Sequence, residues 1–176
     1  NIVSIHEVSM VRSPKGRPFH FIAMEYIHGQ TFAEVLRKEG VSQGEKLRML
    51  EDAARAVGFA HSRGVIHRDL KPANILVDNR DHVFLTDFGL ARAESFTTRL
   101  TRSKTIMGTP QYMAPEQVEG RVKDIDARSD VYALGVILYE TLVGTLPFTE
   151  ESPAVLYHKI VHEDPPRPTR ASRSIE

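Results

Sequence analysis

The sequence predicts an α+β fold, with a small amount of β-structure first and a mostly helical region after it. Residues 2–27 favour strands and a turn, whereas helical patterns with clear start signals recur from Thr31 onward. Runs of strands and helices that are separated along the chain are typical of this class. With 176 residues, of which 41% are hydrophobic, the chain is long enough for one domain with a substantial core.

The composition excludes several classes of partner. The 23 Lys and Arg residues balance 23 Asp and Glu residues, so no net charge attracts nucleic acid or a lipid surface. No apolar run reaches the roughly 18 residues that span a bilayer, and cysteine is absent, which fits a reducing compartment. We therefore expect a cytoplasmic segment that contacts neither nucleic acid nor membrane and recognises its partner through a local site.

The first predicted element is a β-hairpin. Residues 2–11 and 19–26 are rich in strand-favouring side chains, and residues 13–18 between them have the Pro and Gly content of a turn. Two strands alone are marginally stable in water, so we expect this hairpin to need further strands as partners.

Two capping boxes predict the next two helices. In each, a hydroxyl residue is followed three positions later by Glu: Thr31 with Glu34, and Ser42 with Glu45. The first helix is short and ends near Gly40. The second extends over about twenty residues to Gly64, and its apolar face is formed by Leu47, Leu50, Ala54, Val57 and His61.

A second hairpin and two further helices complete the prediction. Residues 75–77 and 82–86 predict strands around a turn at 78–81, and the nearly all-apolar residues 130–143 predict a helix buried in the middle of the domain. Ser152 followed by Pro153 starts a helix that ends at about His162. Residues 91–107 are polar, without periodicity and longer than most loops, and such segments are usually functional or disordered.

A strongly polar run lies between two strand-like runs at residues 64–77. Polar groups beside a core cost free energy unless they are partnered or face a ligand. Asp69 and Asn74 lie in this run and Asp87 follows the second hairpin, so we expect the three side chains to share one neighbourhood. Asn74 and Asp87 offer the oxygen ligands that Mg²⁺ takes together with substrate phosphates. Asp69 would then accept a proton from an attacking hydroxyl, and Lys71 would neutralise a transferring phosphoryl group.

Three motifs stand in a fixed order: H-R-D-L-K-P-A-N at 67–74, D-F-G at 87–89 and A-P-E at 114–116. They resemble the catalytic loop, the metal-binding motif and the end of the activation segment of protein kinases. The sequences of residues 108–117 and 129–140 are most similar to those of bacterial, eukaryotic-like serine/threonine protein kinases. This resemblance covers essentially the whole chain.

The resemblance implies a protein-kinase-like fold. Residues 1–27 would be the remnant of the N-terminal β-lobe, with its hairpin and hinge. Residues 28–176 would form the mostly helical C-terminal lobe, incomplete at its C-terminal end.

The resemblance also implies roles for the catalytic residues. Asp69 would be the catalytic base and Lys71 a phosphate contact, while Asn74 and Asp87 would hold Mg²⁺ at the phosphates of ATP. Lys71 together with Thr109 resembles the pattern of kinases that act on Ser and Thr hydroxyls of proteins.

The same resemblance places the adenine of ATP. Met24 would lie behind the adenine ring, Glu25 and Ile27 would offer backbone groups to its edge, and Leu76 would lie beneath it. Three further residues would form an apolar stack that links the lobes: His67, Phe88 and Ile5. Asp130 would hold the backbone of the catalytic loop from the central helix.

Arg68 bears on regulation. An Arg next to the catalytic Asp is typical of kinases that are activated when a phosphorylated activation loop pairs with it. By their distance from Thr109, the favoured acceptors in the polar segment are Thr101, Ser103 and Thr105, with self-phosphorylation in trans as a possible route. The alternative is a solvated linker, since such linkers often contain hydroxyls and arginines.

Two features of the family do not occur in the sequence. There is no G-x-G-x-x-G, and none of the seven lysines stands in a V-A-I-K-like context. We expect both to precede Asn1, and the Arg that pairs Glu116 at the end of the substrate platform to follow Glu176. Because phosphoryl transfer depends on positioning and charge stabilisation, the chain alone is expected to have little activity while its parent protein is active.

Other readings of the sequence remain open. The polar run could be a self-satisfied turn, and the fold could serve a pseudokinase or scaffold that binds without chemistry, although Asp69, Asn74 and Asp87 are all present. Phosphorylation of a small molecule is disfavoured because residues 108–116 resemble the segment with which protein kinases hold an extended peptide substrate. His158 and His162 have zinc-compatible spacing but no third ligand, so we expect ordinary, partly exposed histidines.

Overall fold

The computed structural model describes residues 1–12, 16, 18–88 and 110–171 of the chain. In chain order the elements are β1 (Ile5–Arg12), β2 (Pro18–Met24), β3 (Gly29–Thr31), α1 (Phe32–Arg37), α2 (Gln43–His61), the 3-10 turn η1 (Pro72–Asn74), β4 (Ile75–Asp78), β5 (Val83–Leu85), the 3-10 turn η2 (Pro110–Tyr112), α4 (Pro115–Val118), the 3-10 turn η3 (Val122–Asp124), α5 (Ala127–Val143), α6 (Pro153–His162) and α7 (Pro168–Ala171). An α+β architecture is therefore confirmed. The predicted polar segment and its candidate phosphorylation sites lie outside the described residues.

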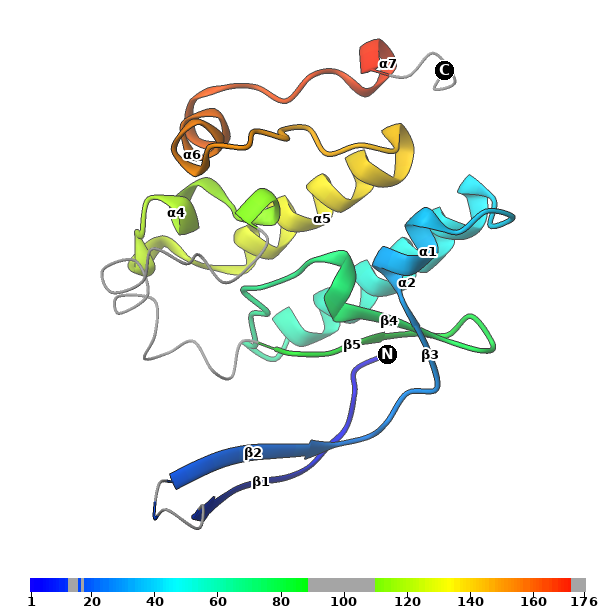
Figure 1. Cartoon of the computed structure of the whole chain (residues 1–176), viewed down its shortest axis with the longest axis vertical. Helices are drawn as coiled ribbons and strands as arrows, with labels where there is room; N and C mark the ends of the chain where they lie inside the picture. Colours follow the sequence, from blue (N-terminus) through cyan, green and yellow to red (C-terminus); the bar gives the residue numbers. More distant parts are fainter. Residues whose placement is uncertain (13–15, 17, 89–109, 172–176) are drawn as a thin grey trace.

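The predicted first hairpin is confirmed. Strands β1 and β2 pair antiparallel over their length, with Val8 opposite Ile22, and they project from the rest of the molecule as a two-stranded ribbon (Figure 1). The segment before β1 is joined to the helical part by the edge of β5. Val3 donates from its N–H to the carbonyl of Leu85 at 2.9 Å, and the N–H of Leu85 donates to the carbonyl of Asn1 at 2.9 Å.

The second sheet has three antiparallel strands in the order β3-β4-β5. Strands β4 and β5 are the predicted second hairpin, whereas β3, with only three residues, was not predicted. Gly29 pairs with Asp78 across β3 and β4, and a Cβ at Gly29 would lie 1.9 Å from the carbonyl oxygen of Val77. Only glycine allows β3 to approach β4 this closely.

Both predicted capping boxes are present. Thr31 Oγ1 accepts a hydrogen bond from the N–H of Glu34, and Ser42 Oγ accepts one from the N–H of Glu45 at 3.2 Å. The buried face of α2 agrees with the predicted one only in part, since Leu50 and Val57 are buried whereas Leu47, Ala54 and His61 are partly buried. It is formed by Met49, Leu50, Ala53, Ala56, Val57 and Ala60. Three of these six residues are Ala, whose small side chains let α2 pack closely against its neighbours. The buried face is therefore less bulky than the predicted one.

Helix α5 is longer than predicted and is not buried on all sides. It begins after the N-cap Asp126, whose carboxylate accepts a hydrogen bond from the N–H of Arg128 at 2.8 Å, and ends at Gly144. The predicted burial is confirmed for the part of α5 that carries Ala133, Val136 and Ile137, but Val131 is 60% exposed and Leu138 41% exposed. Apolar residues all round a helix do not by themselves determine which faces are covered.

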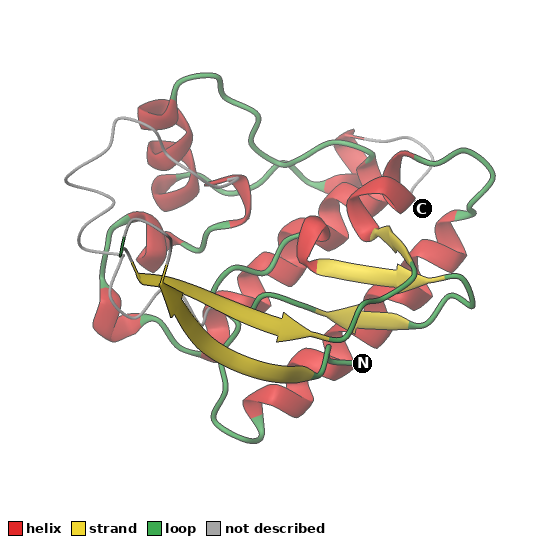
Figure 2. Ribbon diagram, turned by 60° about the horizontal axis from the view of Figure 1, so that its bottom comes forward, coloured by secondary structure: helices red, strands yellow, loops and turns green. Residues whose placement is uncertain are grey.

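The main core lies between the long helices and the three-stranded sheet. Helix α2 packs against both α5 and β5, and Figure 2 shows the long helices passing behind the strands. The core strands contribute four fully buried side chains: Ile75, Val77, Val83 and Leu85. Among the described residues, no helix combines the length and hydrophobicity that a bilayer crossing requires. This core holds α2, β4 and β5 in place. The candidate site lies in the segments that follow α2 and β5.

Candidate active site

Asp130 anchors the loop that follows α2. Its carboxylate lies in the first turn of α5 and is 1% exposed. Oδ2 accepts a hydrogen bond from the N–H of His67 at 2.8 Å, and Oδ1 accepts one from the N–H of Arg68 at 2.8 Å. The helix N-terminus and these donors stabilise the buried carboxylate. The structure therefore shows the contact expected between Asp130 and the backbone of residues 67–68.

His67 joins this loop to the end of β5. Its Nε2 lies 2.9 Å from the carbonyl oxygen of Thr86, and its ring packs against Phe88 with the ring centroids 4.6 Å apart. Burial lowers the pKa of His67, so the ring stays neutral at physiological pH. Because a carbonyl only accepts, Nε2 carries the proton, and Nδ1 accepts the N–H of Asp69 at 3.4 Å. His67 and Phe88 are thus in contact, as expected for two members of the stack.

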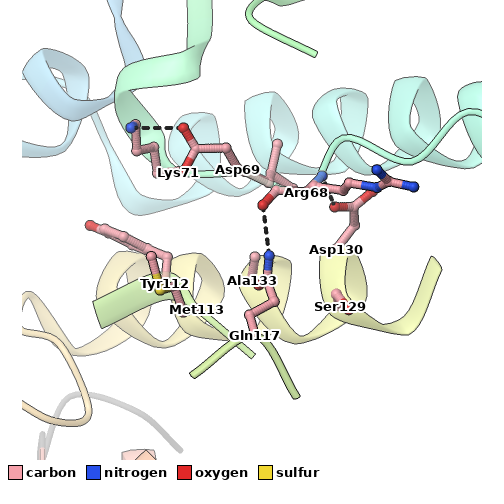
Figure 3. A pocket seen from close by; sticks show the side chains of 10 residues that line it. Arg68, Asp69, Lys71, Tyr112, Met113, Gln117, Ser129, Asp130 and Ala133 are labelled. Carbon is pink, nitrogen blue, oxygen red and sulfur yellow. Dashed lines mark hydrogen bonds and ion pairs between the residues drawn. The ribbon is translucent and has the colours of Figure 1, made fainter. Parts of the chain in front are cut away.

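The side chains of Asp69, Lys71 and Asn74 lie together. Lys71 Nζ is 3.1 Å from Asp69 Oδ2, and Asn74 Nδ2 donates to the Asp69 carbonyl oxygen at 2.8 Å. The same Nδ2 is 3.5 Å from Asp69 Oδ2. Figure 3 shows Lys71 and Asp69 side by side at the margin of a small cavity. A carboxylate next to an ammonium group and an amide is a suitable arrangement for proton transfer beside a phosphoryl group.

Asp87 is connected to this cluster through the backbone. The N–H of Thr86, the preceding residue, donates to the carbonyl of Asn74 at 3.0 Å. Asp87 itself has a φ of 59°, a left-handed conformation that is uncommon for residues other than glycine, and its side chain is exposed. Such backbone conformations are often found at functional sites. The hairpin formed by β4 and β5 therefore brings Asn74 and the start of the D-F-G motif to the same end of the sheet.

The amide of Asn74 is oriented in a way that suits a cation. Since Nδ2 is directed at Asp69, the oxygen Oδ1 is the atom that remains to bind a ligand. An amide oxygen and an exposed carboxylate are the types of group that Mg²⁺ binds. Asn74 and Asp87 therefore fit the predicted metal-binding role by their chemistry.

A small cavity lies between the loop of residues 67–71 and the segment of residues 110–114, which was predicted to face the substrate. Its walls come from the loop, from η2 and the residues after it, and from α5: Arg68, Asp69, Leu70, Lys71, Tyr112, Met113, Gln117, Ser129, Asp130 and Ala133 (Figure 3). Tyr112 donates from its hydroxyl to Glu140 Oε2 at 2.7 Å, and burial together with this bond raises the pKa of Tyr112. The neutral phenol thus fixes this segment against α5.

The residues predicted to contact adenine lie along the segment from β2 to β3. The side chain of Met24 approaches Thr86, whose Oγ1 is 3.8 Å from Met24 Sδ. The N–H of Glu25 donates to Ser4 at 2.9 Å, so a ligand at this edge would meet the carbonyl of Glu25. Leu76 lies in β4, opposite Thr31 in β3, and Ile27 is partly buried. Ile5, the third residue expected in the apolar stack, is 48% exposed, which differs from a packed position in such a stack.

Of the remaining predicted site residues, four lie outside the part of the chain that the structure describes, and two, Glu116 and Arg68, lie inside it. Thr101, Ser103, Thr105 and Thr109 lie outside the described residues. Glu116 accepts a hydrogen bond from the hydroxyl of Ser129, so in the structure its described partner is a hydroxyl and not an Arg. Arg68 has a φ of 66°, and its N–H is held by Asp130.

Sequence reasoning missed two residues of the site. His61 Nε2 lies 2.7 Å from Asp130 Oδ2, and the buried Gln117 contacts the backbone of Arg68. For Gln117 a signal was available, because Gln three residues after Ala114 has the spacing of a capping residue. For His61 the helical pattern indicated only a core position.

Comparison with known proteins agrees with this geometry. A family model described as "Protein kinase domain" matches residues 1–174. The chain belongs to the protein kinase family. The α+β architecture, the anchored catalytic loop and the order of the three motifs are those expected of a member.

Among characterised relatives, the chain is similar to bacterial serine/threonine-protein kinases. It is 40% identical to PknB of Mycolicibacterium smegmatis over 171 residues, covering 96% of this chain and 27% of that protein. It is 38% identical to PknB of Mycobacterium leprae, covering 99% of the chain and 28% of that protein. It is 44% identical to pkn3 of Myxococcus xanthus over 158 residues, covering 85% of the chain and 28% of that protein. The chain thus spans less than a third of the length of these relatives.

Proposed function

We propose that the protein containing this chain transfers the γ-phosphoryl group of ATP to Ser and Thr hydroxyls of protein substrates. The observation that carries this proposal is the contact of Asp69 with Lys71 and Asn74, in a loop held by Asp130. The names of the bacterial relatives support the same reaction. Lys71 supports the Ser/Thr substrate class.

In the proposed reaction, Asp69 accepts the proton of the substrate hydroxyl as the hydroxyl oxygen forms a bond to the γ-phosphorus of ATP. The bond between that phosphorus and the β,γ-bridging oxygen breaks, and ADP leaves with the electron pair. Lys71, 3.1 Å from Asp69, stabilises the charge on the transferring phosphoryl group and also orients the carboxylate. Asn74 holds the backbone of Asp69 at 2.8 Å, which keeps the base at the site of attack.

Asn74 and Asp87 are the proposed ligands of Mg²⁺, which when bound neutralises phosphate charge. Asn74 offers its amide oxygen and Asp87 its exposed carboxylate. Met24, Glu25, Ile27 and Leu76 are the proposed contacts of the adenine, with Glu25 acting through its carbonyl group.

We further propose a division of the chain into an N-lobe remnant, residues 1–27, and a C-lobe, residues 28–176. The projection of β1 and β2 from the helical part supports this division. Because the sequence contains no G-x-G-x-x-G, we also propose that the chain alone transfers phosphate poorly. The lack of cysteine supports a cytoplasmic catalytic segment.

For regulation, we propose that Arg68 pairs with a phosphorylated hydroxyl at Thr101, Ser103 or Thr105, added by a second copy of the protein. Substrate contacts at Thr109 and Glu116 belong to the same proposal. Phosphopeptide mapping of the purified protein tests it, and a modification confined to other residues would contradict it.

The test of the proposed activity uses the full-length protein, a basic acceptor protein and radiolabelled ATP. Asp69→Asn is expected to lower the rate about 10²- to 10⁴-fold, the usual contribution of a general base. Asp87→Asn is expected to weaken Mg²⁺-dependent nucleotide binding as well. Asp81→Asn is the matched control, since Asp81 also has a positive φ, of 64°, but lies in the β4–β5 turn. Asn tolerates that conformation.

The outcomes separate the alternatives. Label on Ser and Thr of the acceptor, retained by Asp81→Asn and lost by Asp69→Asn, supports a protein kinase. Nucleotide binding without transfer would instead indicate a pseudokinase or scaffold. Label that appears only on small molecules would contradict the proposed substrate class.

A further inference from the structure

The side chain of Gln117 bridges α4 and the catalytic loop. Gln117 is 4% exposed. Its Nε2 donates to the carbonyl oxygen of Arg68 at 2.7 Å, and its Oε1 accepts the N–H of Ala114 at 3.0 Å. Figure 3 shows Gln117 reaching across the cavity wall to Arg68. Both ends of a buried amide are therefore paired, and its two partners belong to different segments of the chain.

The orientation of this amide follows from its partners. A reversed side chain would place its oxygen against the Arg68 carbonyl and its NH₂ group against the Ala114 N–H. Both contacts would then be repulsive, because a carbonyl only accepts and a backbone N–H only donates.

The carbonyl that Gln117 binds belongs to the peptide that joins Arg68 to Asp69. The N–H of the same peptide faces His67 Nδ1 at 3.4 Å, and the preceding peptide donates from Arg68 to Asp130 Oδ1 at 2.8 Å. The left-handed φ of 66° at Arg68 is unfavourable for a residue with a side chain and requires support from the surroundings. Gln117 binds the carbonyl of Arg68, while Asp130 binds its N–H, so both main-chain groups of this residue are held by side chains.

Gln117 also holds the end of the substrate-facing segment. Ala114, whose N–H it binds, directly follows Tyr112 and Met113, which line the cavity beside Asp69 and Lys71. One side chain therefore connects the end of this segment to the peptide between Arg68 and Asp69.

We propose that Gln117 is a positioning residue that couples the substrate-facing segment to Asp69. The inference rests on the proposed kinase function, since it assigns Gln117 to the placement of the catalytic base. It requires no contact of Gln117 with ATP or with the substrate.

Two near-isosteric variants of the full-length protein separate the two hydrogen bonds. Gln117→Glu keeps an acceptor for Ala114 but presents an oxygen to the Arg68 carbonyl, whereas Gln117→Met removes both bonds. We expect kcat to fall about ten- to a hundredfold in both, as for a small misplacement of a catalytic group. KM for ATP is expected to change less than about twofold, because the adenine contacts lie elsewhere. Gln43→Glu is the matched control, since Gln43 also donates to a backbone carbonyl, that of Leu142 at 3.0 Å, away from the site.

A second readout does not depend on activity. Amide hydrogen exchange over residues 67–71 should accelerate in both variants, with little change in α2 and α5. A normal kcat and normal exchange in Gln117→Glu would overturn the proposal and reduce Gln117 to a cap of α4. Should Gln117→Glu fail to fold, Gln117→Met gives the same two readouts.

Failure of the proposed function is distinguishable from failure of this inference. If the parent protein transfers no phosphate, the kinase proposal fails, and exchange over residues 67–71 still tests the coupling. If the parent is active and both variants match it in kcat and exchange, only the role of Gln117 is contradicted.

Discussion

The buried Asp130 and the partly buried His61 form a pair, with His61 Nε2 2.7 Å from Asp130 Oδ2. The pair joins the last turn of α2 to the first turn of α5. An ionised carboxylate only accepts hydrogen bonds, so Nε2 of His61 carries a proton and donates. His61 thereby supplies a third hydrogen bond to the carboxylate that also binds the N–H groups of His67 and Arg68.

Replacing His61 by Leu is expected to lower the free energy of unfolding by about 1.5 to 3 kcal/mol, the usual range for a hydrogen bond to a charged group. Urea denaturation followed by circular dichroism measures the change. Gln places an amide nitrogen near the position of Nε2, so His61→Gln should recover most of the loss. Equal stability of the Leu and Gln variants would show that the hydrogen bond is unimportant.

The stability of the protein should depend on pH through His67. Burial lowers the pKa of His67 below its ordinary value of 6.5, so the unfolded chain takes up the proton more readily than the folded protein. The stability from the neutral ring is complete above about pH 6.5 and is lost as the pH falls below that value. His67→Phe keeps an aromatic partner for Phe88 and should flatten this part of the stability profile.

The control for His67 is His162→Phe, in which an exposed ring on α6 is replaced. Unfolding free energies measured between about pH 5 and 8 compare the three proteins, over the range in which His titrates. An unchanged slope in His67→Phe would mean that another group dominates in this range.

Gly29→Ala should strongly destabilise the three-stranded sheet. The added Cβ would lie 1.9 Å from the carbonyl oxygen of Val77, so β3 has to move away from β4. A loss of about 2 kcal/mol or more in unfolding free energy is expected, at the upper end of ordinary point substitutions. The matched control is Gly58→Ala in α2, where a Cβ meets no atom within 4 Å. There Ala should stabilise the helix by about 0.5 to 1 kcal/mol, and equal effects of the two substitutions would contradict the steric argument.

Lys71→Met should lower kcat by about 10²-fold or more, because it removes a cation beside the reacting group. Steady-state phosphorylation of a protein substrate provides the measurement. Lys71→Arg keeps the charge with a different geometry and should lie between Met and the parent protein. A kcat within twofold of the parent for Lys71→Met would remove Lys71 from the mechanism.

The sequence predicted the parts of the fold whose signals are local. Capping boxes at Thr31 and Ser42 gave the starts of two helices, since the interacting residues are three positions apart. The start of α5 was placed too late because Ser129, and not a capping Glu, stands three positions after its N-cap, Asp126. Strand β3 has three residues, too few for a periodic pattern.

The candidate site was predictable where a motif places the chemistry in one short segment. Asp69, Lys71 and Asn74 are within six positions of one another, and the structure brings their side chains together. The contact of Gln117 with Arg68 joins residues 49 positions apart and involves a backbone carbonyl. No side-chain pattern identifies such an acceptor, so only the three-dimensional structure shows it.

Thr86 contacts the loop of residues 67–74 at two points, through its carbonyl to His67 and through its N–H to Asn74. Both are main-chain groups, so every amino acid except proline can make them. The main chain at position 86 therefore helps to set the separation between Asp69 and Asp87, and most substitutions of Thr86 should leave that separation unchanged. Proline alone would cut one of the two connections, which makes that substitution the most informative single change at this position.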